Sequence, residues 1–271
     1  MQWFHGSSHR NIVYEQTMIR NLVYRLRRAL NFNDLECSSA DLLREVSKQK
    51  LWEDTTAFYS QFVKTGDLCF DVGANIGNKT KIFLELGARV VCIEPQPKCV
   101  DVLKEKYKHD SNIAIVSKGL ATQLGSRSLS ICGSADAIST FSEKWKTGRF
   151  RAYAWEPAVD VPVTNLDALI QEFGSPKFCK IDVEGFEYEV LQGLSTPISF
   201  LAFEFTREFI DDARLCIEHL GSLGCADFNY ALGEAPALVL SNWADGNTLF
   251  KSIEQNTDDL LWGDIYVRFH V

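Results

Sequence analysis

The chain has 271 residues, of which 46% are hydrophobic and 24% are charged, and its net charge is −8. This length allows one large or two small domains, and the composition excludes disordered, collagen-like and coiled-coil proteins. The acidic balance disfavours a protein whose main task is to coat nucleic acid, because such a protein neutralises phosphates with Lys and Arg.

The N-terminal part of the chain is predicted to be helical and carries a charge of its own. Residues 1–30 contain five arginines and one glutamate and so carry a charge of +4. With a net charge of −8, the rest of the chain carries −12. Apolar residues between Met18 and Leu30 recur at helical spacing, with arginines on the other side. We expect this helix to pack on the body of the protein or on a second copy of the chain, as in a homodimer. Peripheral contact with a membrane surface and an organelle transit peptide are the alternatives.

Two further helices are predicted before the pattern changes. The segment Ser38–Asp41 resembles a capping box and predicts the start of one helix. A second helix is expected over Trp52–Val63 and would end before Gly66. The sequence therefore divides into a helical extension, residues 1–60, and a single domain, residues 61–271.

The cysteine pattern and the absence of long apolar runs indicate a soluble, cytoplasmic protein. No stretch of 18 uninterrupted apolar residues occurs, and the N-terminus lacks the apolar run of a signal peptide. The eight cysteines include no C-x-x-C pair, and Cys69, Cys92 and Cys179 lie within apolar runs, where a free cysteine behaves as a small buried hydrophobic residue, so we expect a reduced compartment. Neither the cysteines nor the five histidines predict a metal site.

After Gly66, short apolar runs alternate with amphipathic segments. This alternation predicts an α/β fold of three layers around a mostly parallel sheet, with ligands at the carboxyl ends of the strands. The first three predicted strands, which we expect to be buried on both faces, are Leu68–Val72, Val90–Ile93 and Ile113–Val116. Later strands are expected at Phe178–Val183, Phe200–Phe205 and Ile265–Phe269, and helices at Asn78–Leu86, Pro97–Tyr107 and Asp211–Leu220.

The loop after the first predicted strand reads Asp-Val-Gly-Ala-Asn-Ile-Gly over residues 71–77 and precedes a helix. Glycines here allow close approach of a ligand, and the helix N-terminus offers free N–H groups. A P-loop is excluded because Asn78 separates Gly77 from Lys79, and a dinucleotide site is disfavoured because Asn75 replaces its second glycine. The third ligand that a loop of this kind can bind is S-adenosylmethionine.

Two acidic residues favour S-adenosylmethionine. Asp71 ends the first strand, where an acid suits the cationic amino group and sulfonium of the cofactor. Glu94 ends the second strand, where a carboxylate can accept both ribose hydroxyls. The predicted cofactor-binding residues are Asp71, Gly73, Ala74, Asn75, Gly77, Asn78, Glu94, Pro95, Ser117, Gly119, Leu120 and Asp182. Of these, residues 117–120 are expected to flank the adenine.

An insertion at residues 121–165 interrupts the alternation of strands and helices. Strands are expected at Arg127–Cys132 and Val159–Val163, and residues 133–140 are expected to cover the cofactor. Basic and aromatic residues interleave between Phe141 and Trp155. We expect this stretch to form a lid whose aromatic rings stack on a sugar and whose cations meet a phosphate or carboxylate, and the alternative is an exposed insertion without such a role.

Four motifs in order resemble the FkbM family of S-adenosylmethionine-dependent methyltransferases. They are the loop at 71–77, Ile93-Glu94-Pro95, Val-Thr-Asn-Leu-Asp at 163–167 and Lys-Ile-Asp-Val-Glu-Gly-Phe-Glu at 180–187. The resemblance covers roughly residues 66–206. It implies a class I methyltransferase sheet, usually of seven strands with the last antiparallel, and methylation of hydroxyl oxygens on sugars, glycolipids or polyketides. It covers neither residues 1–60 nor the basic aromatic stretch.

Acidic residues near the end of a later strand are the candidates for catalysis. Lys180, Asp182 and Glu184 alternate, so they share one face if the strand continues that far. Asp182 is predicted to be the general base or to orient the acceptor, with Glu184 in support and Glu204 as a second candidate. A structural ion pair of Lys180 with Asp182 is the alternative. Three carboxylates could also hold a divalent cation, although no metal is assigned.

The predicted function is methyl transfer from S-adenosylmethionine to a hydroxyl of a sugar, glycolipid or related small molecule. Two other functions stay open. The basic aromatic stretch could bind single-stranded RNA, as in a ribose 2′-O-methyltransferase, although the acidic body argues against a nucleic-acid partner. The chain could also be a non-catalytic interaction module, against which the intact Asp71, Gly73, Glu94 and Asp182 argue.

Overall fold

The computed structural model describes residues 39–270. The helix predicted between Met18 and Leu30 lies outside these residues. The chain divides into two compact units between Asp54 and Thr55, and the predicted boundary after residue 60 stays a prediction. Among the described helices, none combines the length and the apolar character needed to cross a bilayer.

The first described helix, α2 (Ser39–Tyr59), is continuous. The sequence predicted two helices over this stretch and the following residues, with a new start at Trp52. The predicted break between these two helices was wrong. Neither Gly nor Pro occurs between Ser39 and Tyr59, so no residue there ends the helix.

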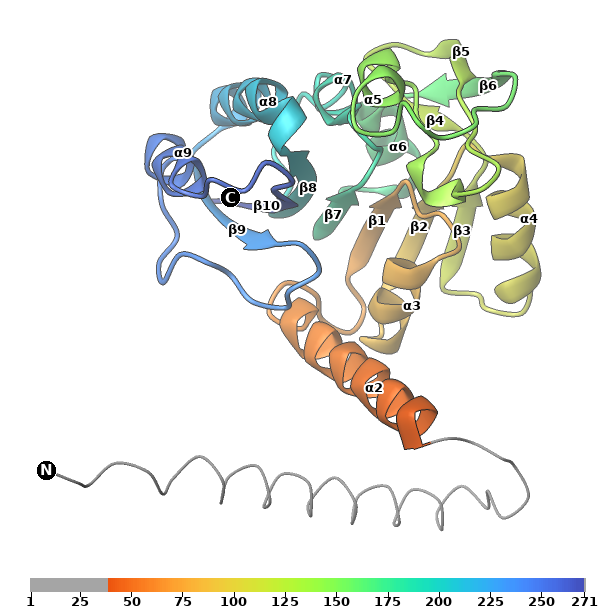
Figure 1. Ribbon diagram of the computed structural model, residues 1–271, viewed down its shortest axis with the longest axis horizontal. Helices are drawn as coiled ribbons and strands as arrows, with labels where there is room; N and C mark the ends of the chain where they lie inside the picture. Colours follow the sequence, from red (N-terminus) through yellow and green to blue (C-terminus); the bar gives the residue numbers. More distant parts are fainter. Residues whose placement is uncertain (1–38, 271) are drawn as a thin grey trace, which may run out of the picture. The chain divides into compact units, whose positions relative to one another are not determined.

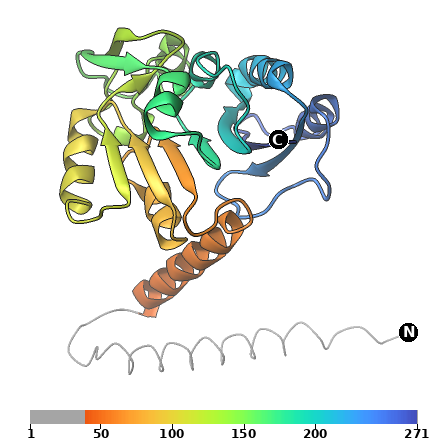
Figure 2. The same ribbon diagram turned by 180° about the vertical axis from the view of Figure 1, so that it is seen from behind.

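A seven-stranded sheet forms the centre of the unit that starts at Thr55, as Figures 1 and 2 show. Its strand order is β3-β2-β1-β7-β8-β10-β9, and only β10 runs antiparallel to its neighbours. The predicted α/β fold of the class I methyltransferase type, with the last strand antiparallel, is therefore confirmed. The strands are β1 (Leu68–Val72), β2 (Arg89–Ile93), β3 (Ile113–Val116), β7 (Phe178–Ile181), β8 (Phe200–Thr206), β9 (Ala226–Leu232) and β10 (Trp262–Phe269).

Helices cover the two faces of this sheet. Apolar residues of β1 at alternate positions, such as Phe70, belong to the main core together with residues of α6, α7 and α8. On the other face, Phe83 of α3 contacts Phe178 of β7, with ring centroids 5.6 Å apart. The helices are α3 (Asn78–Glu85), α4 (Pro97–Lys106), α5 (Glu143–Thr147), α6 (Leu166–Phe173), α7 (Glu187–Leu191), α8 (Ile210–Leu223) and α9 (Gly246–Glu254).

The predicted strands differ from the observed ones in three respects. The strand β3 is partly buried rather than buried on both faces, because it lies at the edge of the sheet. The strand β7 ends at Ile181, two residues before its predicted end. The strand β9 and the helix α9 were not predicted, since Asp227 and Asn229 interrupt the apolar pattern of β9.

The insertion forms a second, three-stranded sheet and the short helix α5. The small sheet has the order β4-β6-β5, with β4 (Gly119–Leu120), β5 (Gly125–Leu129) and β6 (Val159–Thr164). The strand β5 ends three residues before its predicted end. Both views show the small sheet and α5 beside the same end of the central strands (Figures 1 and 2). The insertion therefore stands above the region where the site residues converge.

An aromatic layer packs against the centre of the large sheet. The ring of Phe62 lies between those of Phe178 and Tyr266, with centroid distances of 5.6 and 5.3 Å and nearly parallel planes. Tyr59 adds an edge contact to Phe178 at 5.8 Å. Phe62 is 3% exposed, so this ring joins the chain that follows α2 to strands β7 and β10.

We predict that Phe62→Ala lowers the free energy of unfolding by about 3–5 kcal/mol, because it removes a buried ring and leaves a cavity between two others. Chemical denaturation monitored by circular dichroism measures this loss. Leu260→Ala, at a side chain that is 63% exposed, is the control and should change the value by less than about 0.5 kcal/mol. Equal effects of the two substitutions would contradict the packing role of Phe62.

Candidate functional site

The loop between β1 and α3 contacts the loop that follows β7. Gly73 has a φ of 76°, and a Cβ at this residue would lie 1.8 Å from the carbonyl oxygen of Asp182. Gly77 has a φ of 80°, and its Cβ would lie 2.8 Å from a methyl carbon of Leu103. The sequence attributed these glycines to the approach of a ligand. The structure shows that packing within the protein already requires both of them.

Glu94 follows β2 and holds this loop. Its two carboxylate oxygens accept hydrogen bonds from the backbone N–H groups of Asn75 and Gln96, each at 2.8 Å. The side chain is 6% exposed. Burial raises the pKa of Glu94 to about 7, although the two N–H donors oppose this shift. Each oxygen keeps one lone pair for a further donor such as a hydroxyl.

Asp71 lies beneath the same loop. It is 2% exposed, and its carboxylate accepts a hydrogen bond from the hydroxyl of Thr80 in α3. Burial raises its pKa, while Thr80 and Lys180 act in the opposite direction. Asp71 therefore fastens the end of β1 to the first turns of α3, and its predicted contact with a cofactor stays a prediction.

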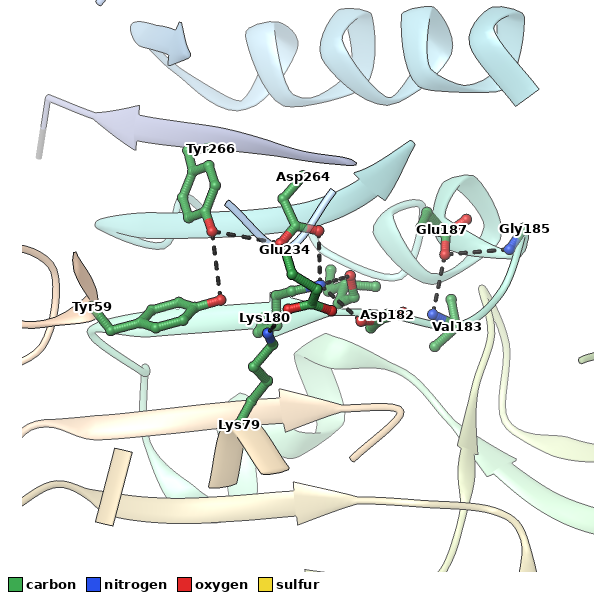
Figure 3. Close-up of polar contacts among 11 residues, drawn as sticks. Tyr59, Lys79, Lys180, Asp182, Val183, Gly185, Glu187, Glu234, Asp264 and Tyr266 are labelled. Atoms are coloured by element: carbon green, nitrogen blue, oxygen red, sulfur yellow. Dashed lines mark hydrogen bonds and ion pairs between the residues drawn. The ribbon is translucent and has the colours of Figure 1, made fainter. Parts of the chain in front are cut away.

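A turn at residues 182–185 follows β7 and carries a strained residue. Glu184 has a φ of 57° and Asn75 one of 50°, and these are the two non-glycine residues with positive φ in the described part of the chain. The carboxylate of Glu187 accepts hydrogen bonds from the N–H groups of Val183 and Gly185 (Figure 3). The hydroxyl of Thr140 donates to the carbonyl of Glu184 at 2.7 Å. A strained backbone conformation that several hydrogen bonds hold in place is common at functional sites.

Lys180 forms the buried ion pair that the sequence analysis left as an alternative. Its side chain is 0% exposed, and its Nζ lies 3.1 Å from Asp182 Oδ2 and 3.0 Å from Asp264 Oδ1 (Figure 3). Burial lowers the pKa of this ammonium, but the two carboxylates outweigh burial and hold it well above its usual range. Lys180 is therefore a charged and fully engaged group that positions Asp182.

The three candidate carboxylates meet although the strand does not continue to Glu184. Asp182, Glu184 and Glu204 each offer one oxygen, and these atoms lie within 4.8 Å of one another. Burial, followed by the neighbouring carboxylates, raises the pKa of Glu184 and of Glu204 well above the usual range. The turn, rather than strand alternation, brings Glu184 to this cluster. The spacing would suit either a proton acceptor or a divalent cation, so both readings stay open.

The basic aromatic stretch is folded onto the protein rather than free. Arg149 makes two hydrogen bonds to Glu208, at 2.6 and 2.9 Å. Lys144 lies 3.2 Å from Asp212 and 4.2 Å from the centre of the Phe209 ring. Acids within residues 208–212 pair with both cations, so a phosphate or carboxylate of a ligand would have to replace these pairs, and the expected contact with such a group stays a prediction.

The remaining predicted residues surround this region unequally. Leu120 is 2% exposed and points into the main core. A Cβ on Gly119 would lie 2.6 Å from the ring of Phe141. Ser117 and Asn78 are exposed, Pro95 is half-buried and Ala74 is buried. None of these side chains joins the carboxylate cluster.

Sequence reasoning missed Asp264 and Glu234. The last strand was predicted to begin at Ile265, so Asp264 was left outside it. An acid inside an apolar strand could have indicated a buried ion pair. Glu234 pairs with Lys79 of α3 at 2.7 Å, which ties the loop after β9 to the first turn of that helix (Figure 3). Only the folded chain brings these partners together.

Comparison with known proteins identifies one family. A family model described as the methyltransferase FkbM domain matches residues 71–233, more than half of the chain. The comparison with curated proteins found no match to this chain.

Solved structures with a related fold include three methyltransferases. Precorrin-6y C5,15-methyltransferase from Geobacter metallireducens is 10% identical, with a TM-score of 0.44, covering 82% of this chain and 89% of that one. An O-methyltransferase from Bacillus cereus in complex with SAH is 8% identical, with a TM-score of 0.40 and coverages of 93% and 90%. An rRNA methylase from Streptococcus thermophilus is 11% identical, with a TM-score of 0.39 and coverages of 79% and 93%. These structures do not identify an acceptor.

We predict a pH-dependent stability that Glu94→Gln removes. The pKa of Glu94 is raised from its ordinary value of 4.5 to about 7, so its ionisation destabilises the folded protein as the pH rises between these values. The free energy of unfolding of Glu94→Gln minus that of the wild type should therefore increase by about 3 kcal/mol from pH 4.5 to 7 and then stay constant.

Urea unfolding of both proteins without cofactor, at several pH values from 4.5 to 8, measures this difference. The amide places a donor opposite one of the two N–H groups, so a constant offset is expected and only the slope is informative. A difference that does not change with pH would contradict the raised pKa of Glu94.

Proposed function

The chain belongs to the FkbM methyltransferase family, and on this premise we propose that it transfers a methyl group to a hydroxyl oxygen of a sugar, glycolipid or related small molecule. The cofactor is S-adenosylmethionine, which supplies an electrophilic methyl group on its sulfonium. The observation that carries the proposal is the carboxylate of Asp182. It is half-buried, it is fixed through one oxygen by Lys180, and its other oxygen has no partner among the described residues.

The residues around the loop after β1 fit this cofactor. Glu94 has two lone pairs left after holding the loop, which is what a pair of ribose hydroxyls requires. The N–H groups at the start of α3 are free of side-chain caps, so they are available to an anionic group such as the carboxylate of the methionine part. The surplus of acid around Asp182 suits a positive sulfonium.

Asp182 would act as the general base. When the acceptor oxygen attacks, an O–C bond forms, the C–S bond breaks and the hydroxyl proton passes to the free oxygen of Asp182. The ion pair with Lys180, together with the backbone N–H that Asp182 donates to Val72, holds that carboxylate in one place. Such positioning and proton transfer are the two contributions that a protein can make to this displacement.

The folded insertion favours a small acceptor over RNA. A single-stranded RNA would need free cations along a groove. Three cations of the basic stretch are instead paired with acids of the same chain: Lys144 with Asp212, Lys146 with Glu143, and Arg149 with Glu208. Among the described cations between Phe141 and Trp155, Arg151 is the one without an acid partner.

Cofactor binding is the first test. We expect isothermal titration calorimetry to detect binding of S-adenosylhomocysteine to the wild-type chain. Glu94→Ala should weaken this binding about tenfold or more, because two ribose hydroxyls lose a charged acceptor. Glu105→Ala, at an exposed acid of α4, is the matched control and should bind as the wild type does. Absence of binding, or equal binding by both variants, would overturn the assignment of the pocket.

Catalysis by Asp182 is the second test. After a screen of glycans and glycolipids with labelled methyl donor has identified an acceptor, Asp182→Asn should lower kcat by about 10²- to 10⁴-fold, because the amide cannot take the proton. Its affinity for S-adenosylhomocysteine should not change.

The same assay separates a base from a metal ligand. Turnover by the wild type should persist in EDTA if Asp182 acts as a base. Turnover that EDTA abolishes and Mg²⁺ restores would show instead that the three carboxylates hold a cation. Full activity of Asp182→Asn would remove this residue from the mechanism.

A further inference from the structure

Two adjacent residues of the insertion make hydrogen bonds to two separate parts of the proposed site. The hydroxyl of Ser139 donates to the side-chain oxygen of Gln96, between β2 and α4, at 2.8 Å. The hydroxyl of Thr140 donates to the carbonyl of Glu184, in the turn that follows β7, at 2.7 Å. The side of the site predicted to hold the cofactor and the side that carries Asp182 are therefore joined to neighbouring positions of one segment.

Ser139 acts on the residue that holds Glu94. Gln96 is 2% exposed, and its backbone N–H donates to a carboxylate oxygen of Glu94 at 2.8 Å. The side-chain NH₂ group of Gln96 donates to Cys99 at 2.9 Å, so its side-chain oxygen is left for Ser139. Without that hydroxyl a buried acceptor would lose its partner, which favours a rearrangement of Gln96. Glu94 would then lose part of the support that orients its carboxylate.

Thr140 is fixed on two sides before it contacts the turn. It is 1% exposed, and its backbone exchanges two hydrogen bonds with Ser130, at 2.9 and 3.0 Å. Its hydroxyl oxygen accepts a hydrogen bond from the backbone N–H of Ser142 at 2.8 Å. The hydroxyl hydrogen is therefore directed at the carbonyl of Glu184, and the fold of the insertion holds this contact in place.

The turn at residues 182–185 needs such a restraint. The φ of Glu184 is 57°, a conformation that a residue with a Cβ adopts at a cost in energy. Glu187 holds two N–H groups of this turn (Figure 3), and Thr140 holds one of its carbonyls. The turn brings the carboxylates of Asp182 and Glu184 together. Loss of the hydrogen bond from Thr140 would let the turn relax and would displace the carboxylate that we assign as the base.

We propose that Ser139 and Thr140 are positioning residues for methyl transfer. Ser139 acts on the cofactor through Gln96 and Glu94, and Thr140 acts on the acceptor side through the turn that carries Asp182. The inference rests on the proposed function, which it deepens by giving the insertion a part in the reaction. Residues that only stabilised the fold would affect both sides of the site alike, so substitutions at these two neighbours should differ in what they change.

The first part of the test measures binding of S-adenosylhomocysteine to the full chain by isothermal titration calorimetry. Ser139→Ala should weaken binding about fivefold, because Glu94 loses indirect support. Ser126→Ala is the matched control, since the hydroxyl of Ser126 also donates to a carbonyl oxygen, that of Val161 at 3.2 Å, but within the small sheet. It should bind as the wild type does. Thr140→Val should bind within about twofold of the wild type.

The second part measures hydrogen exchange of the turn, which needs no acceptor. In Thr140→Val, the two amides that donate to Glu187 should exchange about tenfold faster, because the turn opens more easily. Thr147→Val is the matched control, since the hydroxyl of Thr147 donates to the carbonyl of Glu143 at 3.0 Å, within α5. It should leave this exchange unchanged, and Thr140→Ser, which keeps the hydroxyl, should restore it. If Thr140→Val does not fold, Thr140→Cys replaces it, because a thiol is a weaker donor.

The third part measures turnover with the acceptor found by the screen. Thr140→Val should lower kcat about tenfold or more while the KM for the cofactor stays near that of the wild type, because a displaced base slows the chemical step. Ser139→Ala should mainly raise the KM for the cofactor. Thr140→Ser should recover most of kcat, and Thr147→Val should keep it.

The outcomes separate the inference from the proposed function. Turn amides that exchange at the wild-type rate in Thr140→Val would overturn the inference, and so would equal binding of S-adenosylhomocysteine by Ser139→Ala and Ser126→Ala. Changes of kcat and KM in the same proportion in Ser139→Ala and Thr140→Val would also overturn it, since that pattern indicates a role in stability alone. A wild-type chain that binds no S-adenosylhomocysteine loses the proposed function. One that binds it and transfers methyl groups, without this difference between the variants, loses only the inference.

Discussion

The contact between Gly73 and the carbonyl of Asp182 constrains everything else in the site. A side chain at residue 73 would put its Cβ 1.8 Å from that oxygen, so the loops after β1 and β7 can meet only through glycine. The N–H of Asp182 also bonds to the carbonyl of Val72. These two contacts fix the distance between the loop that Glu94 holds and the carboxylate of Asp182. A cofactor bound at the first loop, as we propose, would therefore lie beside the second.

Charge balance links this contact to the topology of the sheet. Lys180 is wholly buried and must keep its proton in a place with little water, so it needs anionic partners on both sides. Asp182 supplies one, and Asp264 of the antiparallel strand β10 supplies the other. The last strand therefore does more than complete the sheet, because its acid lets Lys180 hold Asp182 through one oxygen and leave the other free.

The sequence predicts the parts of this site that depend on neighbouring residues. The apolar strands, the loop after β1 and the carboxylates at the strand ends follow from local patterns, and Asp71, Glu94 and Asp182 were predicted as site residues in this way. Asp264 was missed because periodicity shows that a strand exists and not which strand it joins. The partners of Lys144 and Arg149 were missed for the same reason, since Asp212 and Glu208 lie 68 and 59 residues further along the chain. The packing role of the glycines was not predicted because a Cβ clash is visible only once two loops face each other.

The charges of the insertion and of the carboxylate cluster bear on the chemistry of the site. Lys144 and Arg149 pair with Asp212 and Glu208, so these two cations hold the insertion to the residues that follow β8. Burial and the neighbouring carboxylates raise the pKa of Glu184 and of Glu204 well above the usual range, so these two groups favour the protonated form rather than a negative charge. Asp182, which keeps Lys180 as its partner, is then the carboxylate of this cluster that would face a positive sulfonium in the function that we propose.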